Sequence, residues 1–179
     1  MKLKPELITN RMDDGVNYSP EDITKSPNNL FGLDDFCKEN IKPEFKILEL
    51  GTNKGVSTSL FAYYASEVVT VDLSRNEKLE KVLQTYDNIK FIQGNIYDVV
   101  PKLPNNYFDV VYIDADHHVT SVLSDIQITF PKLKPHGIMS GHDYHENEAY
   151  HGVAFDAVNI AFRGMKIIRY KDSTWKVQL

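Results

Sequence analysis

The stretch FKILELGTNKGVSTSL, residues 45–60, decides the fold. Apolar residues lead into a turn that contains Gly51 and Gly55, and a helical pattern follows the turn. A strand, a glycine turn and a helix in this order are typical of a nucleotide-binding βα unit. Gly51 allows the backbone to approach a ligand closely, and Gly55 opens a helix whose N–H groups point at that ligand.

Two positions distinguish this stretch from a dinucleotide-binding turn. Asn53 stands where the dinucleotide fingerprint has its middle glycine, and the acid Glu49 comes just before the turn. A carboxylate at this place suits a cationic ligand, such as an aminoacyl group, better than a diphosphate. The alternative interpretation is a tight turn of the kind found in any α/β protein.

Strand-like and helix-like segments alternate after this unit. We predict strands over 45–50, 67–72, 89–93, 107–113, 136–141, 165–170 and 174–178, and helices over 30–40, 55–65, 76–86, 96–102, 119–130 and 150–162. This alternation predicts an α/β fold with a Rossmann-like, doubly wound, mostly parallel sheet of seven strands. The short link at Asp172-Ser173 predicts that the last two strands form an antiparallel hairpin.

The chain is expected to form a single domain over residues 1–179. Its first 40 residues would supply a turn-rich arm and a short helix, and residues 45–179 would form the cofactor-binding core. The net charge of -5 disfavours general binding to nucleic acids or anionic membranes. A single cysteine, Cys37, excludes an internal disulfide, and we find neither a signal peptide nor a membrane span, so we expect a cytoplasmic protein.

Asp72 ends the second predicted strand, roughly twenty residues after Gly51, where a ribose-binding acid is expected. We predict that it accepts hydrogen bonds from the ribose hydroxyls, and the alternative is a helix N-cap or turn aspartate. Asn95 and Ile96 follow the third strand, where an amide and an apolar side chain can flank a base. Asn95 is equally suited to be an ordinary N-cap.

Acids and histidines follow the next two predicted strands. Asp114 and His117 come after one strand, and His142 and Asp143 come after the other. If these strands are neighbours, the four side chains meet in one cleft and can form a divalent metal site, a general-base site, or both. We interpret Asp114, His117 and Asp143 as functional, and the other histidines outside the metal hypothesis as turn residues: His118, His136, His145 and His151.

Three of these segments resemble the class I S-adenosylmethionine-dependent methyltransferases: ILELGTNKG, VVTVDLS and FDVVYIDADHH. Further stretches resemble a bacterial subfamily of small O-methyltransferase-like domains with IDGDHSY-like, HDY-like and GVxxAV-like motifs: IDADHHVTSVLSDI, LKPHGIMSGHDY and HGVAFDAVNIAF. His136 departs from that pattern, because it replaces the second glycine of a GG pair.

The resemblance implies a role for each candidate residue. It places the methionine end of the cofactor at Glu49, Gly51, Thr52, Asn53, Gly55 and Ser57, the ribose at Asp72 and Leu73, and the adenine at Asn95 and Ile96. Asp114 would lie near both the methionine moiety and the acceptor, and His117 matches a general base. Related enzymes bind Mg²⁺ at positions that match Asp114 and Asp143, and His142 as a third ligand would suit a softer metal.

The function implied is S-adenosylmethionine-dependent methylation of a small-molecule hydroxyl, with Asp114 and His117 as catalytic residues. One alternative is a noncatalytic module that binds S-adenosylmethionine. Another is an NAD-type oxidoreductase, which Glu49 and the missing middle glycine disfavour.

Overall fold

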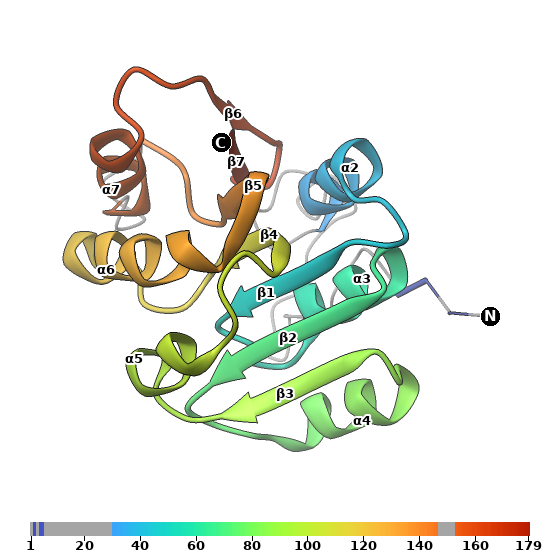
Figure 1. The fold of residues 1–179 in the computed structure, drawn as a ribbon. Helices are drawn as coiled ribbons and strands as arrows, with labels where there is room; N and C mark the ends of the chain where they lie inside the picture. Colours follow the sequence, from blue (N-terminus) through green and yellow to red (C-terminus); the bar gives the residue numbers. More distant parts are fainter. Residues whose placement is uncertain (1, 3, 6–29, 147–152) are drawn as a thin grey trace, which may run out of the picture.

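The computed structural model describes residues 2, 4, 5, 30–146 and 153–179, which are coloured in Figure 1. In this part of the chain one sheet has the strand order β3-β2-β1-β4-β5-β7-β6. The strands are β1 (Lys46–Leu50), β2 (Glu67–Asp72), β3 (Ile89–Gln93), β4 (Phe108–Ile113), β5 (Leu133–Gly141), β6 (Ile167–Arg169) and β7 (Trp175–Gln178). Strands β1 to β5 are parallel, and β7 is antiparallel to both β5 and β6. The predicted seven-stranded sheet with an antiparallel C-terminal hairpin is therefore confirmed.

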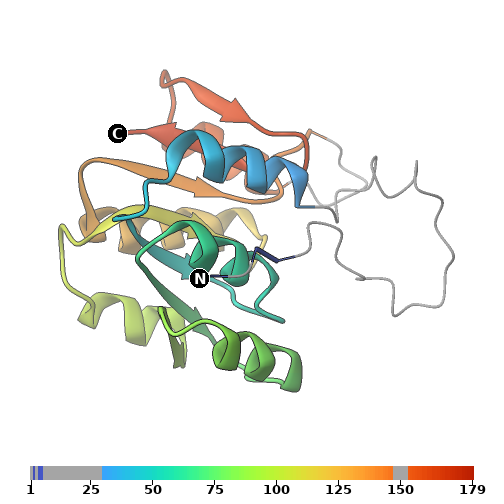
Figure 2. The ribbon, with the colours of Figure 1, turned by 90° about the vertical axis from the view of Figure 1, so that its right-hand side faces the viewer.

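Helices cover both faces of the sheet. They are α2 (Phe31–Asn40), α3 (Val56–Tyr64), α4 (Glu77–Thr85), α5 (Ile96–Val99), α6 (Val119–Thr129) and α7 (Val153–Ala161). Helices α2, α3 and α4 lie on one face, which Figure 2 shows from the front, and α5, α6 and α7 lie on the other (Figure 1). None of the helices in the described ranges is both long and apolar enough to cross a membrane.

The side-chain alternation of β1 divides the core into two clusters. Ile47 packs with buried residues of α2 and α3, such as Phe36 and Phe61, while Leu48 and Leu50 belong to the cluster on the α6 and α7 side. Because successive strand residues point to opposite faces, Glu49 faces α3.

Most element boundaries agree with the sequence predictions to within two residues, with two exceptions. Strand β5 begins at Leu133 rather than 136, because Leu133 already pairs with Phe108 of β4. The register then shifts between Phe108 and Val110, and His136 adopts a φ of 63°. The helix expected over 96–102 is α-helical to Val99 and continues as a 3₁₀ turn that contains Pro101. Most of the predicted arm, including residues 6–29, and residues 150–152 of the last predicted helix lie outside the described residues.

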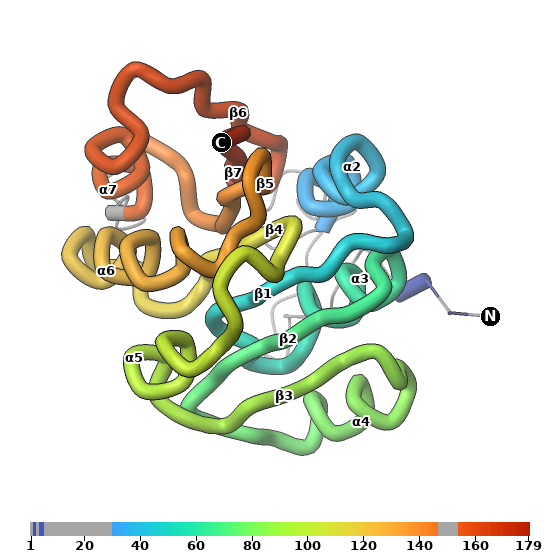
Figure 3. The backbone as a smooth tube through the Cα atoms, viewed as in Figure 1, coloured from blue at the N-terminus to red at the C-terminus, as the bar shows by residue number. Residues whose placement is uncertain are grey.

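The C-terminal hairpin is tied to α2, a segment far away in the sequence (Figure 3). Asp172, only 1% exposed, accepts a 2.7 Å hydrogen bond from the backbone N–H of Leu33 in the first turn of α2. Gly32 lies so close that an added Cβ would stand 2.1 Å from the carboxylate of Asp172. A carboxylate at a helix N-terminus is stabilising, so this contact helps to fix α2 on the sheet.

Candidate functional site

A cavity of about 760 Å³ lies at the carboxyl ends of β1, β2 and β4, where open α/β sheets bind ligands. Its volume falls in the range of small-molecule sites. The predicted site residues on its wall are Gly51, Thr52, Asn53, Ser57, Asp72, Leu73, Asn95, Ile96, Asp114, His117, His142 and Asp143. The tertiary structure thus brings twelve of the fourteen predicted residues to one cavity, and leaves Glu49 and Gly55 off its wall.

The backbone conformation of the glycine turn at one end of the cavity accounts for the residues found there. Gly51 has a φ of 88°, and an added Cβ there would lie 2.0 Å from the backbone oxygen of Asp114, so a side chain is excluded twice. Asn53 has a φ of 46°, in the left-handed region that asparagine tolerates better than most residues. Asn53 can therefore replace the middle glycine of the fingerprint without loss of the turn.

Asp72 connects β2 to this turn. Its Oδ2 accepts hydrogen bonds from the backbone N–H groups of Thr52 (2.9 Å) and Asn53 (2.8 Å), and its Oδ1 accepts one from the N–H of Ser74 (3.0 Å). The carboxylate thus has a structural role in addition to any role in binding. It still lies on the cavity wall, between the turn and Leu73.

Glu49 lies behind the cavity wall. It is fully buried, and its two carboxylate oxygens accept hydrogen bonds from the hydroxyls of Ser57 (2.5 Å) and Thr58 (2.6 Å) in α3. Burial raises the pKa of Glu49 to about 7, although these two hydrogen bonds oppose the increase. Glu49, which we expected at the methionine end, is not among the residues of the cavity wall, whereas its hydrogen-bond partner Ser57 is.

The opposite end of the cavity gathers histidines and acids from the β4–α6 loop and the segment after β5. Pairing of β4 with β5 aligns Ile113 with Gly141, so the residues that follow the two strands meet. His117 Nδ1 lies 2.8 Å from Asp143 Oδ2, and His142 Nδ1 lies 3.1 Å from Asp143 Oδ1. Asp143 adopts a φ of 58°.

The charges at this end are mutually dependent. Burial opposes ionisation of Asp143, but hydrogen bonds from His117 and His142 hold its pKa well below the usual range. The hydrogen bond with Asp143 raises the pKa of His117, although burial opposes this. Burial alone would lower the pKa of His142, but the bond to Asp143 and the charge of Asp114 raise it to about 9. The Asp143 carboxylate therefore contacts both imidazoles and raises the pKa of each.

Comparison with known proteins identifies the fold family. Residues 48–144, more than half of the chain, match a family described as a methyltransferase domain. The chain belongs to this family. No curated protein matches the methyltransferase chain.

Solved structures resemble this chain in fold. The O-methyltransferase from Bacillus cereus, in complex with SAH (S-adenosylhomocysteine), is 16% identical with a TM-score of 0.59, over 91% of this chain and 83% of that one. MycE from the mycinamycin biosynthetic pathway, in complex with Mg, SAH and mycinamycin VI, is 15% identical with a TM-score of 0.60, over 82% of this chain and 48% of that one. The tRNA (m1A58) methyltransferase TrmI from Aquifex aeolicus is 16% identical with a TM-score of 0.61, over 83% and 67%.

These identities are low, so the similarities show the fold alone. The methyltransferase chain spans about half the length of MycE, and about half that of the YcgJ protein from Bacillus subtilis, of which it covers 53%. The acceptors named for these proteins are therefore not assigned to this chain.

The geometry of the site groups three candidate metal ligands. Within the described ranges, Asp114, His117 and Asp143 each offer one candidate ligand atom within 4.8 Å of the others. His142 is not a member of this group. The third member of this candidate group is thus His117 and not the predicted ligand His142, and the metal itself stays a prediction. Two carboxylates and an imidazole fit a divalent transition metal.

Some cavity residues were missed by the sequence interpretation: Lys54, Val56, Val71, Tyr97, Ala115, Asp116, Ser121 and His145. Most are chain neighbours of predicted residues, which was the available signal. Among the histidines expected to be turn residues, His118 bonds to Asp116, and His145 lies on the cavity wall. His136 stands at the irregular part of β5, and His151 is outside the described residues.

Proposed function

We propose that this chain is an S-adenosylmethionine-dependent methyltransferase that methylates a hydroxyl group of a small molecule. One observation carries the proposal: a single cavity joins the glycine turn and Asp72 at one end to the His117–Asp143 pair at the other. Such a cavity can hold a nucleoside-based methyl donor and an acceptor in contact, which is the main requirement of a group transfer. The net charge of -5 favours a small-molecule acceptor over a nucleic acid.

The donor residues fit this cofactor. S-Adenosylmethionine supplies, when bound, a methyl group on a positively charged sulfur. Asp72 offers a carboxylate for the ribose hydroxyls, and Ser57, held by Glu49, is placed for the amino-acid end. Leu73 and Ile96 supply apolar surface for the base.

His117 is the proposed general base. An alcohol is a weak nucleophile at neutral pH, so its proton must leave as the new C–O bond forms. Because Nδ1 of His117 bonds to Asp143, Nε2 is the nitrogen placed to take this proton. Asp143 orients the imidazole and stabilises the imidazolium that forms, as the third member of a catalytic triad does.

A divalent metal is the second arrangement that an observation favours. Asp114, His117 and Asp143 would hold it, and an imidazole ligand favours Mn²⁺, Fe²⁺ or Zn²⁺ over Mg²⁺. The metal would lower the pKa of the acceptor hydroxyl. His117 would then be a ligand, and Asp143 would exchange its hydrogen bond with His117 for the metal.

Calorimetry tests the cofactor proposal directly. We expect S-adenosylhomocysteine to bind to the protein and NADH to give no signal. Binding of NADH without any response to S-adenosylhomocysteine would refute the proposal. Titration of the protein with MnCl₂, followed by electron paramagnetic resonance, tests the metal, and Asp143→Asn is the variant expected to weaken binding.

The transfer itself is tested with small hydroxyl compounds in the presence and absence of EDTA. Unchanged activity in EDTA would favour His117 as base, and loss of activity that Mn²⁺ restores would favour the metal. S-Adenosylhomocysteine binding without turnover of any acceptor would instead support a noncatalytic binding module.

A further inference from the structure

The turn between β6 and β7 is buried, although turns that connect strands normally face the solvent. Asp172, Ser173 and Thr174 are each at most 3% exposed. Ser173 also adopts a φ of 66°, which is unfavourable for residues other than glycine. A buried turn with a strained residue persists only where the surrounding structure determines it, so its contacts indicate its role.

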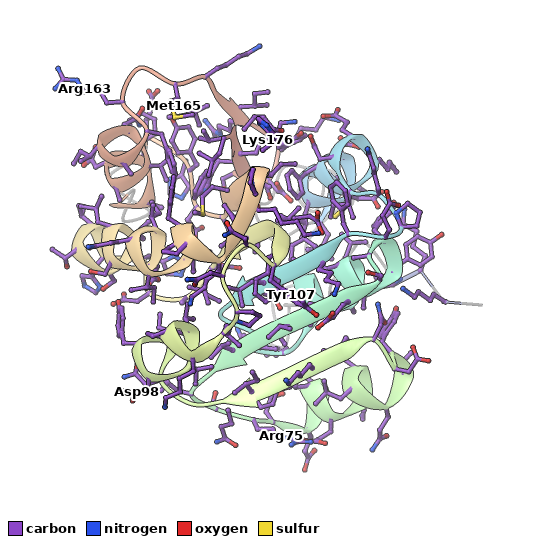
Figure 4. The ribbon with its side chains drawn as sticks, viewed as in Figure 1. Arg75, Asp98, Tyr107, Arg163, Met165 and Lys176 are labelled. Atoms are coloured by element: carbon purple, nitrogen blue, oxygen red, sulfur yellow. The ribbon has the colours of Figure 1, made fainter. Side chains whose placement is uncertain are left out.

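Helix α2 holds this turn in place. The two carboxylate oxygens of Asp172 accept separate hydrogen bonds, one from the backbone N–H of Leu33 (2.7 Å) and one from that of Thr174 (3.0 Å). At the other end of α2, Lys176 of β7, which is labelled in Figure 4, bonds to Asn40. The hairpin is thus attached to both ends of α2, so the position of the turn is fixed relative to the helix.

The carbonyl of the strained residue, Ser173, contacts the backbone at the histidine end of the cavity. It accepts a 3.0 Å hydrogen bond from the backbone N–H of Tyr144, the residue that follows Asp143. On the other side of Asp143, the backbone N–H of His142 donates a 3.1 Å hydrogen bond to the carbonyl of Ile113 at the end of β4. Asp143 itself has a φ of 58°. Its backbone is therefore held from both sides in a conformation that aspartate seldom adopts.

We infer that Ser173 is a positioning residue: its carbonyl fixes the backbone that carries Asp143, and Asp143 in turn orients His117. This inference rests on the proposed function, in which His117 takes the proton of the acceptor. For that step the imidazole must carry its own proton on Nδ1 and leave Nε2 unprotonated. The 2.8 Å contact of Nδ1 with Asp143 favours this tautomer. If the turn shifts, the carboxylate moves away from Nδ1 and the preference is lost.

The test compares two substitutions at the same position. A β-branched residue is strongly disfavoured at a positive φ, so Ser173→Val should turn the carbonyl away from the N–H of Tyr144. Glycine adopts this conformation readily, so Ser173→Gly should keep the contact and is the matched control. Both variants lose the serine hydroxyl, and neither changes a charge.

Two NMR measurements on the ligand-free protein report the result. Hydrogen exchange of the Tyr144 amide should be roughly 3- to 10-fold faster in Ser173→Val than in the wild-type protein, the range of one lost hydrogen bond. Long-range ¹H–¹⁵N spectra, recorded at a pH where the ring is neutral, show which nitrogen of His117 carries the proton. We expect Nδ1 in the wild-type and Ser173→Gly proteins, and a shift toward Nε2 in Ser173→Val.

Asp172→Asn moves the turn in a second way and serves if Ser173→Val does not fold. Its amide has one acceptor oxygen, so it keeps only one of the two hydrogen bonds that the carboxylate accepts and should cause the same two changes. Asp34→Asn is the control, because Asp34 is an equally buried carboxylate of α2 that bonds instead to Lys38 and Tyr64. It should leave both NMR measurements as in the wild-type protein.

An unchanged exchange rate and tautomer in a folded Ser173→Val or Asp172→Asn variant would overturn the inference, and so would equal changes in Asp34→Asn. Failure of the wild-type protein to bind S-adenosylhomocysteine would instead defeat the proposed function. The two NMR measurements are made without a ligand, so they decide whether Ser173 positions His117 in either case.

Discussion

The two ends of the cavity are built from different kinds of contact. At the glycine turn, Asp72 binds the backbone N–H groups of Thr52 and Asn53. At the histidine end, the contacts join side chains from two segments that follow β4 and β5, His117 and Asp143. Backbone contacts survive most substitutions of the residues that donate them, whereas a side-chain pair is lost with either member. We therefore expect single substitutions to affect chemistry most at the histidine end and ligand affinity most at the turn.

The largest effect is expected for His117→Ala. Loss of the general base should lower the methyl-transfer rate by roughly 10²–10⁴-fold, while the affinity for S-adenosylhomocysteine changes little. Single-turnover kinetics and calorimetry measure the two quantities. His136→Asn is the control, because this exposed histidine has a positive φ that asparagine tolerates. Full activity of the His117→Ala variant would show that His117 is only a turn residue.

Glu49→Gln tests the buried acid behind the glycine turn. Burial raises the pKa of Glu49 from 4.5 to about 7, so the folded state binds the proton more tightly than the unfolded state. This contribution to stability is complete below the unfolded pKa and is lost as the pH rises to about 7. The loss amounts to at most about 3 kcal/mol.

The measurement is urea unfolding of wild-type and Glu49→Gln protein at several pH values. The difference between their free energies of unfolding should shift in favour of the variant as the pH rises from about 4.5 to 7, and then stay constant. A difference that does not vary with pH would mean that Glu49 titrates as an ordinary exposed acid.

Asp72→Ala should weaken the binding of S-adenosylhomocysteine by about 1–3 kcal/mol, because the ribose hydroxyls lose a charged acceptor. The same substitution leaves the N–H groups of Thr52 and Asn53 without their carboxylate, so a moderate fall in thermal stability is expected too. Asp72→Asn keeps one oxygen and should be intermediate in calorimetry. Wild-type affinity in the alanine variant would limit Asp72 to its role in the turn.

The smallest effect is expected for substitutions of Asn95, which distinguish its role as an N-cap from a role in contacting the base. As an N-cap, Asn95→Ala should cost about 1 kcal/mol of stability, and Asn95→Asp should restore it because aspartate caps equally well. If the amide also donates to the base, Asn95→Asp should still bind S-adenosylhomocysteine less tightly. Equal affinity in both variants and the wild-type protein would assign Asn95 to capping alone.

The local sequence determined the β1–turn–α3 unit, the alternation of strands and helices, and the C-terminal hairpin. Glycine at positive φ, apolar periodicity and turn residues act over a few neighbouring positions, so their consequences can be predicted from the chain itself. The same applies to the cap that Asn95 forms with Tyr97, whereas the bonds of Asp72 with Thr52 and Asn53 join two strand ends far apart in the sequence.

Only the tertiary structure decided which side chains face each other. The alternation of β1 turns Glu49 toward Ser57 and Thr58 and away from the cavity wall, and the pairing of β4 with β5 selects His117 as well as His142 as a partner of Asp143. These contacts depend on sheet register and side-chain direction across long sequence separations. Residue type and spacing identified the groups near the cavity, but not the partner that each one finds there.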